Sequence, residues 1–298
     1  MRWFGLFRAS GTLSALLAIL FLSPAAYADS GEMGDWGVWM RESVTPVMDK
    51  IHELNNILHI ISVVIVLFIL VLLVIVCVRF RASKNPVPSK TSHNTKLEIL
   101  WTTIPILILV MIAVPSFRLL YFMNDSSDAE MTLKITGNQW FWTYTYPDHD
   151  DLTFDAFLVA EEDLEDGQPR LLTTDNPVVL PANTKIRLIG TSVDVIHAWA
   201  MPQFGVKFDT VPGRLQEAPV FVTKEGTYYG QCSELCGVDH GYMPIEVRVV
   251  PREEFDTWIE EMKEEYADNS GTTPVNSAPA GVSLALGSQA EVTEESKQ

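Results

Sequence analysis

The residues with the clearest potential for chemistry lie together in one short segment, 232–243, here called the ligand loop. It contains two thiols (Cys232 and Cys236), an imidazole (His240) and a thioether (Met243). Soft sulfur ligands combined with imidazole select copper over magnesium, calcium or manganese. A mononuclear blue-copper site uses one cysteine, whereas this loop offers two, four residues apart. Two thiolates on one loop could bridge two metal ions, each of which then keeps one histidine and one weaker ligand.

Such a site needs a second imidazole, and the chain has six histidines. His52, His59 and His93 belong to the segments around an expected membrane helix, and His149 stands among aspartates in an expected solvated turn. His197 ends a strand-like apolar run, a position that is often occupied by a structural core histidine. Beside an incomplete set of copper ligands, His197 is nevertheless favoured as the second imidazole.

Two other chemistries use the same residue types. Zinc accepts two cysteines and two histidines, but structural zinc sites usually space the cysteines as Cys-x2-Cys, and methionine is not a zinc ligand. A redox dithiol uses Cys-x-x-Cys, whereas Cys232 and Cys236 are separated by three residues. No Cys-x-x-Cys-His motif is present for covalent attachment of a c-type haem. Cys77 lies in an apolar run and is expected to be an inert hydrophobic residue.

The N-terminal residues have the form of an export signal, predicted to span 1–28. Basic residues precede an apolar stretch, and small residues at 26–28 offer a cleavage site. A retained first membrane helix is the alternative, although the apolar stretch is short for that role. The mature chain is expected to begin near Asp29.

Residues 29–125 are predicted to form an N-terminal segment and two membrane helices, at about 57–78 and 99–120, each long enough to cross a bilayer. Thr45 followed by Pro46 is typical of a helix start. The short loop between the helices carries five basic residues, so the positive-inside rule assigns that loop to the cytoplasm. The ligand loop then lies on the opposite, periplasmic side.

After Asp125 the sequence becomes rich in β-branched and aromatic residues, interrupted by Gly, Pro, Asn and Asp. Several short strands without a long helix between them predict a sandwich or barrel of about 120 residues. The expected strand runs are 131–146, 177–189, 219–222, 228–231 and 244–250. Apolar spacing from Arg252 to Tyr266 predicts an amphipathic helix. The tail, 267–298, has the composition of a disordered or processed segment.

The formal net charge is -17. Nucleic acid is therefore excluded as an expected partner, because phosphate binding depends on Lys and Arg. An acidic surface instead suits a basic protein partner, attracted by long-range steering that salt weakens.

Taken together, these features resemble subunit II of cytochrome c oxidase. This is the CuA-containing subunit of bacterial-type oxidases in the haem-copper oxidase family. The resemblance covers about Val47 to Met262. It includes both helices, His197, the ligand loop, the aromatic run Gly137–Tyr144 and the turn Pro212–Leu215. It implies a two-helix transmembrane hairpin followed by an all-β, cupredoxin-like Greek-key barrel, here residues 126–266 with the C-terminal helix.

The resemblance also implies roles for individual residues. The copper ligands would be the side chains of His197, Cys232, Cys236, His240 and Met243, with the backbone carbonyl of Glu234. The Glu234 side chain would help to hold magnesium at the interface with the catalytic subunit. Trp140 matches the aromatic at which electrons enter, and Glu98 matches a carboxylate near the mouth of a proton-uptake path. Matches to the acidic docking surface are Asp148, Asp151, Asp175 and Asp194. One departure is Asn138, which stands where many relatives have histidine.

The function implied is electron transfer within a respiratory complex. The chain would accept electrons from cytochrome c at a binuclear CuA centre and pass them to haem in the catalytic subunit I. The complex, which would also contain subunit III, would reduce oxygen to water and pump protons across the bacterial inner (plasma) membrane. The alternatives are the CuA domain of another reductase such as nitrous oxide reductase, a copper chaperone or storage protein, and a quinol-oxidase subunit. The two helices disfavour the first, and the two thiols disfavour the last.

Overall fold

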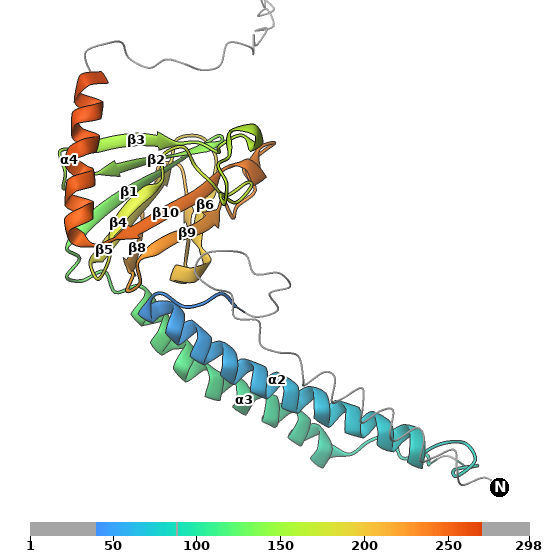
Figure 1. The fold of residues 1–298 in the computed structure, drawn as a ribbon. Coiled ribbons are helices and arrows are strands. Elements are labelled where there is room, and N and C mark those ends of the chain that lie inside the picture. Colours follow the sequence, from blue (N-terminus) through green and yellow to red (C-terminus); the bar gives the residue numbers. More distant parts are fainter. Residues whose placement is uncertain (1–39, 88, 270–298) are drawn as a thin grey trace, which may run out of the picture.

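The computed structural model describes residues 40–87 and 89–269 of the chain. The predicted export signal and nearly all of the predicted tail lie outside these residues. Two long helices form a hairpin below a β-domain, and the two parts are joined at one end of the hairpin (Figure 1).

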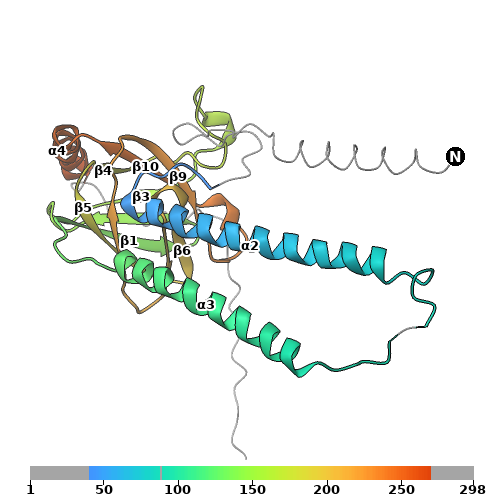
Figure 2. The ribbon, with the colours of Figure 1, turned by 90° about the horizontal axis from the view of Figure 1, so that it is seen from below.

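The hairpin consists of α2 (Pro46–Arg79) and α3 (Thr95–Met123). Both are long and apolar enough to cross a membrane, and none of the most apolar window of either helix is buried within the chain. The expected spans lie inside these helices, which extend beyond the apolar runs at both ends. Helix α2 begins where Thr45 and Pro46 predict, because the Thr45 Oγ1 atom accepts a hydrogen bond from the Met48 N–H at 3.0 Å. Figure 2 shows the two helices running side by side.

The β-domain contains two main sheets and a separate strand pair. The first sheet has the order β3-β2-β1-β5-β8, with bounds Leu152–Ala156, Phe141–Tyr146, Met131–Asn138, Lys185–Ser192 and Gln216–Phe221. The second has the order β4-β10-β9, with bounds Val178–Pro181, Pro244–Val250 and Gly226–Gln231. Strands β6 (His197–Met201) and β7 (Val206–Thr210) pair antiparallel. Strand β1 runs parallel to β5, and β4 parallel to β10, while the other pairs are antiparallel.

Several expected strand boundaries are wrong. The run 131–146 is a hairpin of two strands, because the chain reverses between Asn138 and Phe141. The run 177–189 is also two strands, separated by a turn at Asn183, whose backbone has a φ of 55°. Strands β3 and β7 were not expected. Their termini are set by the partners they pair with, which a local pattern does not reveal.

The core lies between the two main sheets. Trp142, Tyr144 and Tyr146 alternate with more exposed residues along β2 and are almost completely buried. The Tyr146 hydroxyl donates to the Val179 carbonyl at 2.9 Å, which ties the two sheets together. Helix α4 (Arg252–Asn269), in the expected place, buries Phe255 against this core. Three short 3-10 turns complete the described chain: Glu161–Asp163, Pro202–Phe204 and His240–Tyr242.

The start of α2 is also anchored to the β-domain. The Thr45 hydroxyl donates to the Phe204 carbonyl at 2.8 Å, and the Thr223 N–H donates to the Val44 carbonyl at 2.9 Å. Val44 and Met48 are both buried. These contacts fix the hairpin to the domain through a connection other than the covalent link from α3 to β1.

Candidate metal centre

The ligand loop connects β9 to β10 and is closed at its base. Gln231 and Pro244 face each other in the strand pair, and the Cys232 N–H donates to the Met243 carbonyl at 3.2 Å. One further bond holds the loop against β6, since the Ser233 N–H donates to the Ala198 carbonyl at 3.0 Å. This contact brings His197, the first residue of β6, beside the loop, although Cys232 lies 35 positions later in the sequence. His197 therefore opens a strand, whereas the sequence predicted that it ends one.

Of the six expected donor atoms, two are a central pair of sulfurs and the other four lie around them. The Sγ atoms of Cys232 and Cys236 are 3.9 Å apart. The Cys232 sulfur lies 3.9 Å from the His197 Nδ1 atom and 3.4 Å from the Glu234 carbonyl oxygen. The Cys236 sulfur lies 3.5 Å from both the His240 Nδ1 atom and the Met243 Sδ atom. Each sulfur thus has one imidazole and one weaker donor beside it.

This donor set fits a pair of copper ions better than the alternatives. A disulfide bond measures about 2.05 Å, so the two sulfurs remain separate ligands. The donors of His197, Cys232 and Cys236 all lie within 4.8 Å of one another, and all three side chains are buried. A closed structural zinc site needs four donors, whereas six converge here and two of them are weak. Thiolate, imidazole and thioether together are the ligands that copper prefers.

The protons of the two thiols are not equivalent. Burial opposes ionisation of Cys232, but hydrogen bonds with His197 and neighbouring backbone groups outweigh it and lower its pKa to about 7. Burial, followed by the adjacent charge of Cys232, raises the pKa of Cys236 to about 12. The metal-free pair therefore loses one proton readily near neutral pH. Loss of the second thiol proton, from Cys236, is favoured only when a cation binds.

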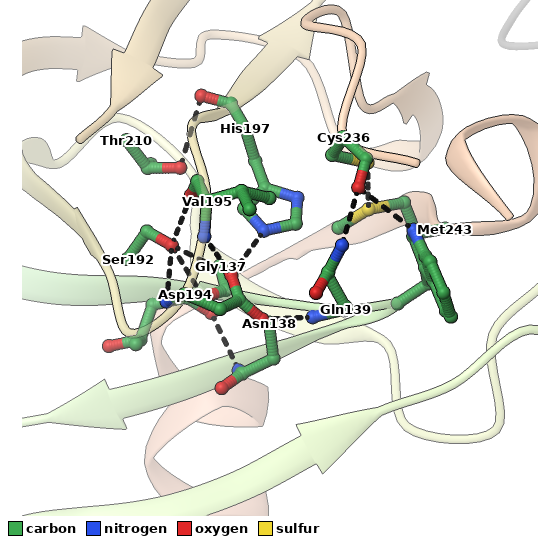
Figure 3. A network of polar contacts seen from close by, with 12 residues as sticks. Gly137, Asn138, Gln139, Ser192, Asp194, Val195, His197, Thr210, Cys236 and Met243 are labelled. Carbon is green, nitrogen blue, oxygen red and sulfur yellow. Dashed lines mark hydrogen bonds and ion pairs between the residues drawn. The ribbon is translucent and has the colours of Figure 1, made fainter. Parts of the chain in front are cut away.

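A network of polar contacts supports His197 from behind (Figure 3). Its Nε2 atom lies 2.9 Å from the Asp194 Oδ1 atom. Although burial opposes protonation, the contacts with Cys232 and Asp194 raise the pKa of His197. Gly137 on β1 backs the imidazole, because a Cβ atom there would lie only 2.8 Å from the His197 Cδ2 atom. The position of His197 thus depends on a carboxylate on one side and a missing side chain on another.

Trp140 is in direct contact with the ligand loop. Its indole N–H donates to the Cys236 carbonyl at 3.3 Å, and the neighbouring Gln139 side-chain amide donates to the same oxygen at 2.7 Å. Gly237 makes room for this approach, since a Cβ atom there would lie 2.9 Å from the Trp140 ring. The partly buried indole therefore reaches a predicted copper-ligand residue through a single hydrogen bond.

The four predicted docking aspartates are not brought together. Asp148 and Asp151 lie in the turn after β2, at the end of that strand away from Trp140. Asp175 lies at the same end of the sheet as Trp140. Its carboxylate accepts a hydrogen bond from the Phe157 N–H, and Phe157 directly follows Ala156, the β3 residue that pairs with Trp142. Asp194 contacts a predicted copper ligand, and the other three have no such contact among the interactions described.

The remaining predicted residues are also located. The Glu234 side chain is exposed at the surface of the ligand loop. Glu98 lies in the first turn of α3, at the end of the hairpin far from the β-domain, and pairs with His93 at 2.8 Å. The Asn138 amide donates to the Thr136 carbonyl at 3.2 Å and to the Thr143 hydroxyl at 3.0 Å, so it belongs to the β1–β2 turn rather than to the donor set.

Sequence reasoning missed the contacts made by Gln139 and the internal contacts of Asp194. It also missed the acidic stretch after β3, with Glu161, Glu162, Asp163, Glu165 and Asp166. The spacing Asp194-x-x-His197 was the available signal for a carboxylate beside a ligand histidine. The density of carboxylates in 161–166 was the available signal for an additional acidic surface.

Comparison with known proteins gives the family. Residues 131–250 match the periplasmic domain of cytochrome c oxidase subunit II, and residues 34–119 match its transmembrane domain. A probable cytochrome c oxidase subunit 2 from Rickettsia felis is 49% identical over 245 residues, covering 82% of this chain and 77% of that protein. Cytochrome c oxidase subunit 2 from Arabidopsis thaliana is 46% identical over 230 residues, covering 75% of this chain and 88% of that protein.

Among solved structures, the periplasmic domain of subunit II of cytochrome oxidase from Bradyrhizobium japonicum is 49% identical, covering 47% of this chain and 99% of that one, with a TM-score of 0.45. The two family matches, together with the hairpin and the β-domain, confirm the expected fold: a two-helix membrane hairpin and a cupredoxin-like domain. The chain therefore belongs to the cytochrome c oxidase subunit II family.

Proposed function

We propose that this chain accepts electrons from cytochrome c at a binuclear copper centre and passes them to haem in the catalytic subunit. The observation that carries the proposal is the grouping of four further donors around two buried sulfurs 3.9 Å apart. When bound, the copper pair supplies reversible storage of one electron shared between two ions. The ligands would be His197, Cys232, the Glu234 carbonyl, Cys236, His240 and Met243.

The protein's part in this reaction is to hold the donors rigidly and to exclude water. One hydrogen bond joins the two ends of the ligand loop (Cys232 N–H to the Met243 carbonyl) and another holds its start to β6 (Ser233 N–H to the Ala198 carbonyl). Both bonds limit how far the donors move when the charge changes. Burial of both thiols and of Met243 keeps water from competing for the ligand positions. A rigid, dry site changes little on gaining or losing an electron, which favours fast transfer.

Trp140 would be the residue through which electrons enter. Its indole is partly exposed and donates to the Cys236 carbonyl, so it connects the surface to a sulfur ligand. Asp175 and the acidic stretch 161–166 would attract a basic donor to this end of the domain. Asp148 and Asp151, at the other end of β2, would contribute through the long-range field rather than through contact.

Other roles follow from the family and from the topology. Glu234 would ligate magnesium at the interface with catalytic subunit I, and Glu98 would lie near the mouth of a proton-uptake path. Subunit III would complete the complex, which reduces oxygen to water and pumps protons. The hairpin would lie in the bacterial inner membrane with the β-domain in the periplasm. The three basic residues between α2 and α3, and the two in the adjoining helix ends (Arg79 and Lys96), agree with this orientation.

The test is made on the full chain in detergent, loaded with copper. Copper per chain and the electron paramagnetic resonance spectrum are measured during a reductive titration. Two coppers, with one unpaired electron coupled equally to both nuclei and reversible on reduction, support the proposal. A single copper with a one-nucleus pattern, or copper that binds without reversible reduction, would overturn it.

Cysteine variants supply the matched control. Cys77→Ser removes an exposed thiol on α2 and should leave two coppers per chain. Cys236→Ser removes one of the two central sulfurs and should abolish the coupled signal. If Cys77→Ser lost copper to the same extent as Cys236→Ser, the site assignment would be wrong.

A further inference from the structure

Two cations stand on the hairpin at the end nearest the β-domain, and neither has an anionic partner. Lys50 belongs to the second turn of α2, and Arg118 lies near the end of α3. Among the residues that the structure describes, neither side chain forms an ion pair or a hydrogen bond. By contrast, the Lys185 Nζ atom at the start of β5 lies 3.9 Å from the Asp125 carboxylate. The counter-ion of Lys50 and Arg118 therefore has to come from outside the described chain.

One aromatic ring places both cations on the same face of the hairpin. The Lys50 Nζ atom lies 4.8 Å from the centroid of the Phe122 ring, although the two residues belong to different helices. Arg118 is one turn earlier on α3, and residues four apart on a helix are neighbours on one face. All three side chains are exposed. Lys50 and Phe122 therefore lie at the same depth, with Arg118 about 6 Å further along α3.

This face, here called the cationic face (Lys50, Arg118 and Phe122), looks away from the junction with the β-domain. The cavity at that junction is lined by Leu120 of α3, together with Val206 and Pro219 of the β-domain. At about 100° per residue, Leu120 points about 200° away from Arg118. The cationic face is instead continuous with the apolar surface of the hairpin, which is exposed (Figure 2).

The depth of the cationic face corresponds to the headgroup layer of a bilayer. The apolar run of α2 begins at Ile57, seven residues after Lys50, and Arg118 stands among the last apolar residues of α3. The headgroup layer adds roughly 5–7 Å on each side of the hydrocarbon core, which is close to the spacing of the two cations along the helix axis. Long basic side chains at helix ends extend into this layer. A cation held there meets lipid phosphates.

We propose that the cationic face binds the phosphate of an anionic phospholipid, on the side of the membrane that carries the β-domain. A guanidinium offers a planar fork of donors that matches a phosphate, and an ammonium adds a second charge. Two positive charges without a carboxylate favour a lipid of net negative charge, such as phosphatidylglycerol. The ammonium group of a zwitterionic lipid would compete with Lys50 and Arg118 for the same phosphate. This lipid site belongs to the hairpin and is independent of the copper centre.

The test counts the lipids that the full chain retains in neutral detergent, by native mass spectrometry during titration with phosphatidylglycerol or phosphatidylcholine. No copper is added, so the result is separate from the proposed function. The basic residues at the other end of the hairpin bind lipid in every variant and serve as an internal reference.

At the lowest concentration that saturates the wild type, the double variant Lys50→Gln and Arg118→Gln should retain one phosphatidylglycerol fewer. Each single variant should weaken the binding of that lipid about 5-fold, and Arg118→Lys should weaken it less, because it keeps the charge. Lys134→Gln is the matched control, since it removes an exposed cation from β1 and should bind as the wild type does. Retention of phosphatidylcholine should be the same in all variants.

Three results would overturn the proposal. If the wild type retained both lipids equally, or the double variant lost none, the cations would not select an anionic lipid. If inorganic phosphate displaced the lipid completely, the site would bind a free anion. If the double variant kept its lipid but no longer co-purified with the catalytic subunit, the cations would pair with a carboxylate of that subunit. Should the double variant misfold by circular dichroism, the single variants decide, because each removes one exposed charge.

Discussion

Replacing Gly137 by alanine would place a methyl group directly against the imidazole of His197. The new Cβ atom would lie 2.8 Å from the His197 Cδ2 atom and 3.0 Å from both the His197 Cγ atom and the Thr210 hydroxyl oxygen. Ordinary contact begins at 3.4 Å. The ring or the strand must therefore move by about 0.6 Å, a displacement comparable with those that overpacking forces on a dense core.

Neither partner can make that movement freely. Gly137 is paired on both sides, with Trp142 in β2 and Ser192 in β5, so its backbone is fixed within the sheet. His197 is fully buried, with the Trp142 ring at its edge and the Asp194 carboxylate at its Nε2 atom. Overpacking of this kind costs about 1–3 kcal/mol. Replacing a strand glycine returns about 0.5–1 kcal/mol, which leaves a net loss of up to about 2.5 kcal/mol.

The assay is urea unfolding of the metal-free chain in detergent, followed by near-ultraviolet circular dichroism of the β-domain, with copper retention measured separately. Gly241→Ala is the matched control, because Gly241 lies in the ligand loop beside His240 but a Cβ atom there would meet nothing within 4 Å. We expect the control to change stability by less than about 0.5 kcal/mol. If Gly137→Ala were as harmless as the control and kept its copper, the close backing of His197 would not matter and the reasoning would be refuted.

Four further predictions concern other contacts. Trp140→Phe keeps an aromatic ring but loses the donor to Cys236; electron uptake at saturating cytochrome c should slow while stopped-flow samples keep the wild-type copper spectrum. Thr45→Ala removes the cap of α2 and the bond to Phe204, so urea unfolding should show a loss of about 1–2 kcal/mol, with Thr45→Ser restoring most of it. Burial opposes ionisation of Asp194, but hydrogen bonds from His197, Val195 and Gln139 outweigh it and hold its pKa below 3.8; its ionised form therefore stabilises the metal-free fold above about pH 4. That contribution is lost as the pH falls through the lower folded pKa, so the stability difference between wild type and Asp194→Asn should narrow in acid unfolding experiments. Asp175→Asn should raise the cytochrome c concentration needed for half-maximal rate at low salt more than Asp148→Asn or Asp151→Asn, and equal effects would contradict the placement of the docking surface.

The donor set could be predicted because most of it is local. Cys232, Cys236, His240 and Met243 lie within twelve residues, and their chemistry does not depend on knowing the fold. His197 could be inferred because few other histidines were available on the same side of the membrane. The structure brings all of these residues together, with the Glu234 carbonyl that the family resemblance implied. Their role as copper ligands stays a prediction.

The supporting contacts could not be predicted in the same way. Asp194 has the appearance of a surface charge in the sequence, which does not reveal its contact with Gln139, 55 positions earlier. Strand β6 is buried along its whole length, so it lacks the alternation that marks a strand with one exposed face. His149 lies in a turn, as expected, but its ring packs edge-on against Phe255 of α4, with centroids 5.5 Å apart. Each of these depends on the tertiary arrangement rather than on local pattern.

The 3.9 Å between the two sulfurs has a consequence for the biogenesis of the protein. On the proposed topology the β-domain would lie in an oxidising compartment, where two free thiols this close could form a disulfide. Disulfide formation would shorten the separation to about 2.05 Å and withdraw both sulfurs from the copper. If the site binds copper as proposed, the thiols would have to be kept reduced, or returned to the reduced state, before the metal enters.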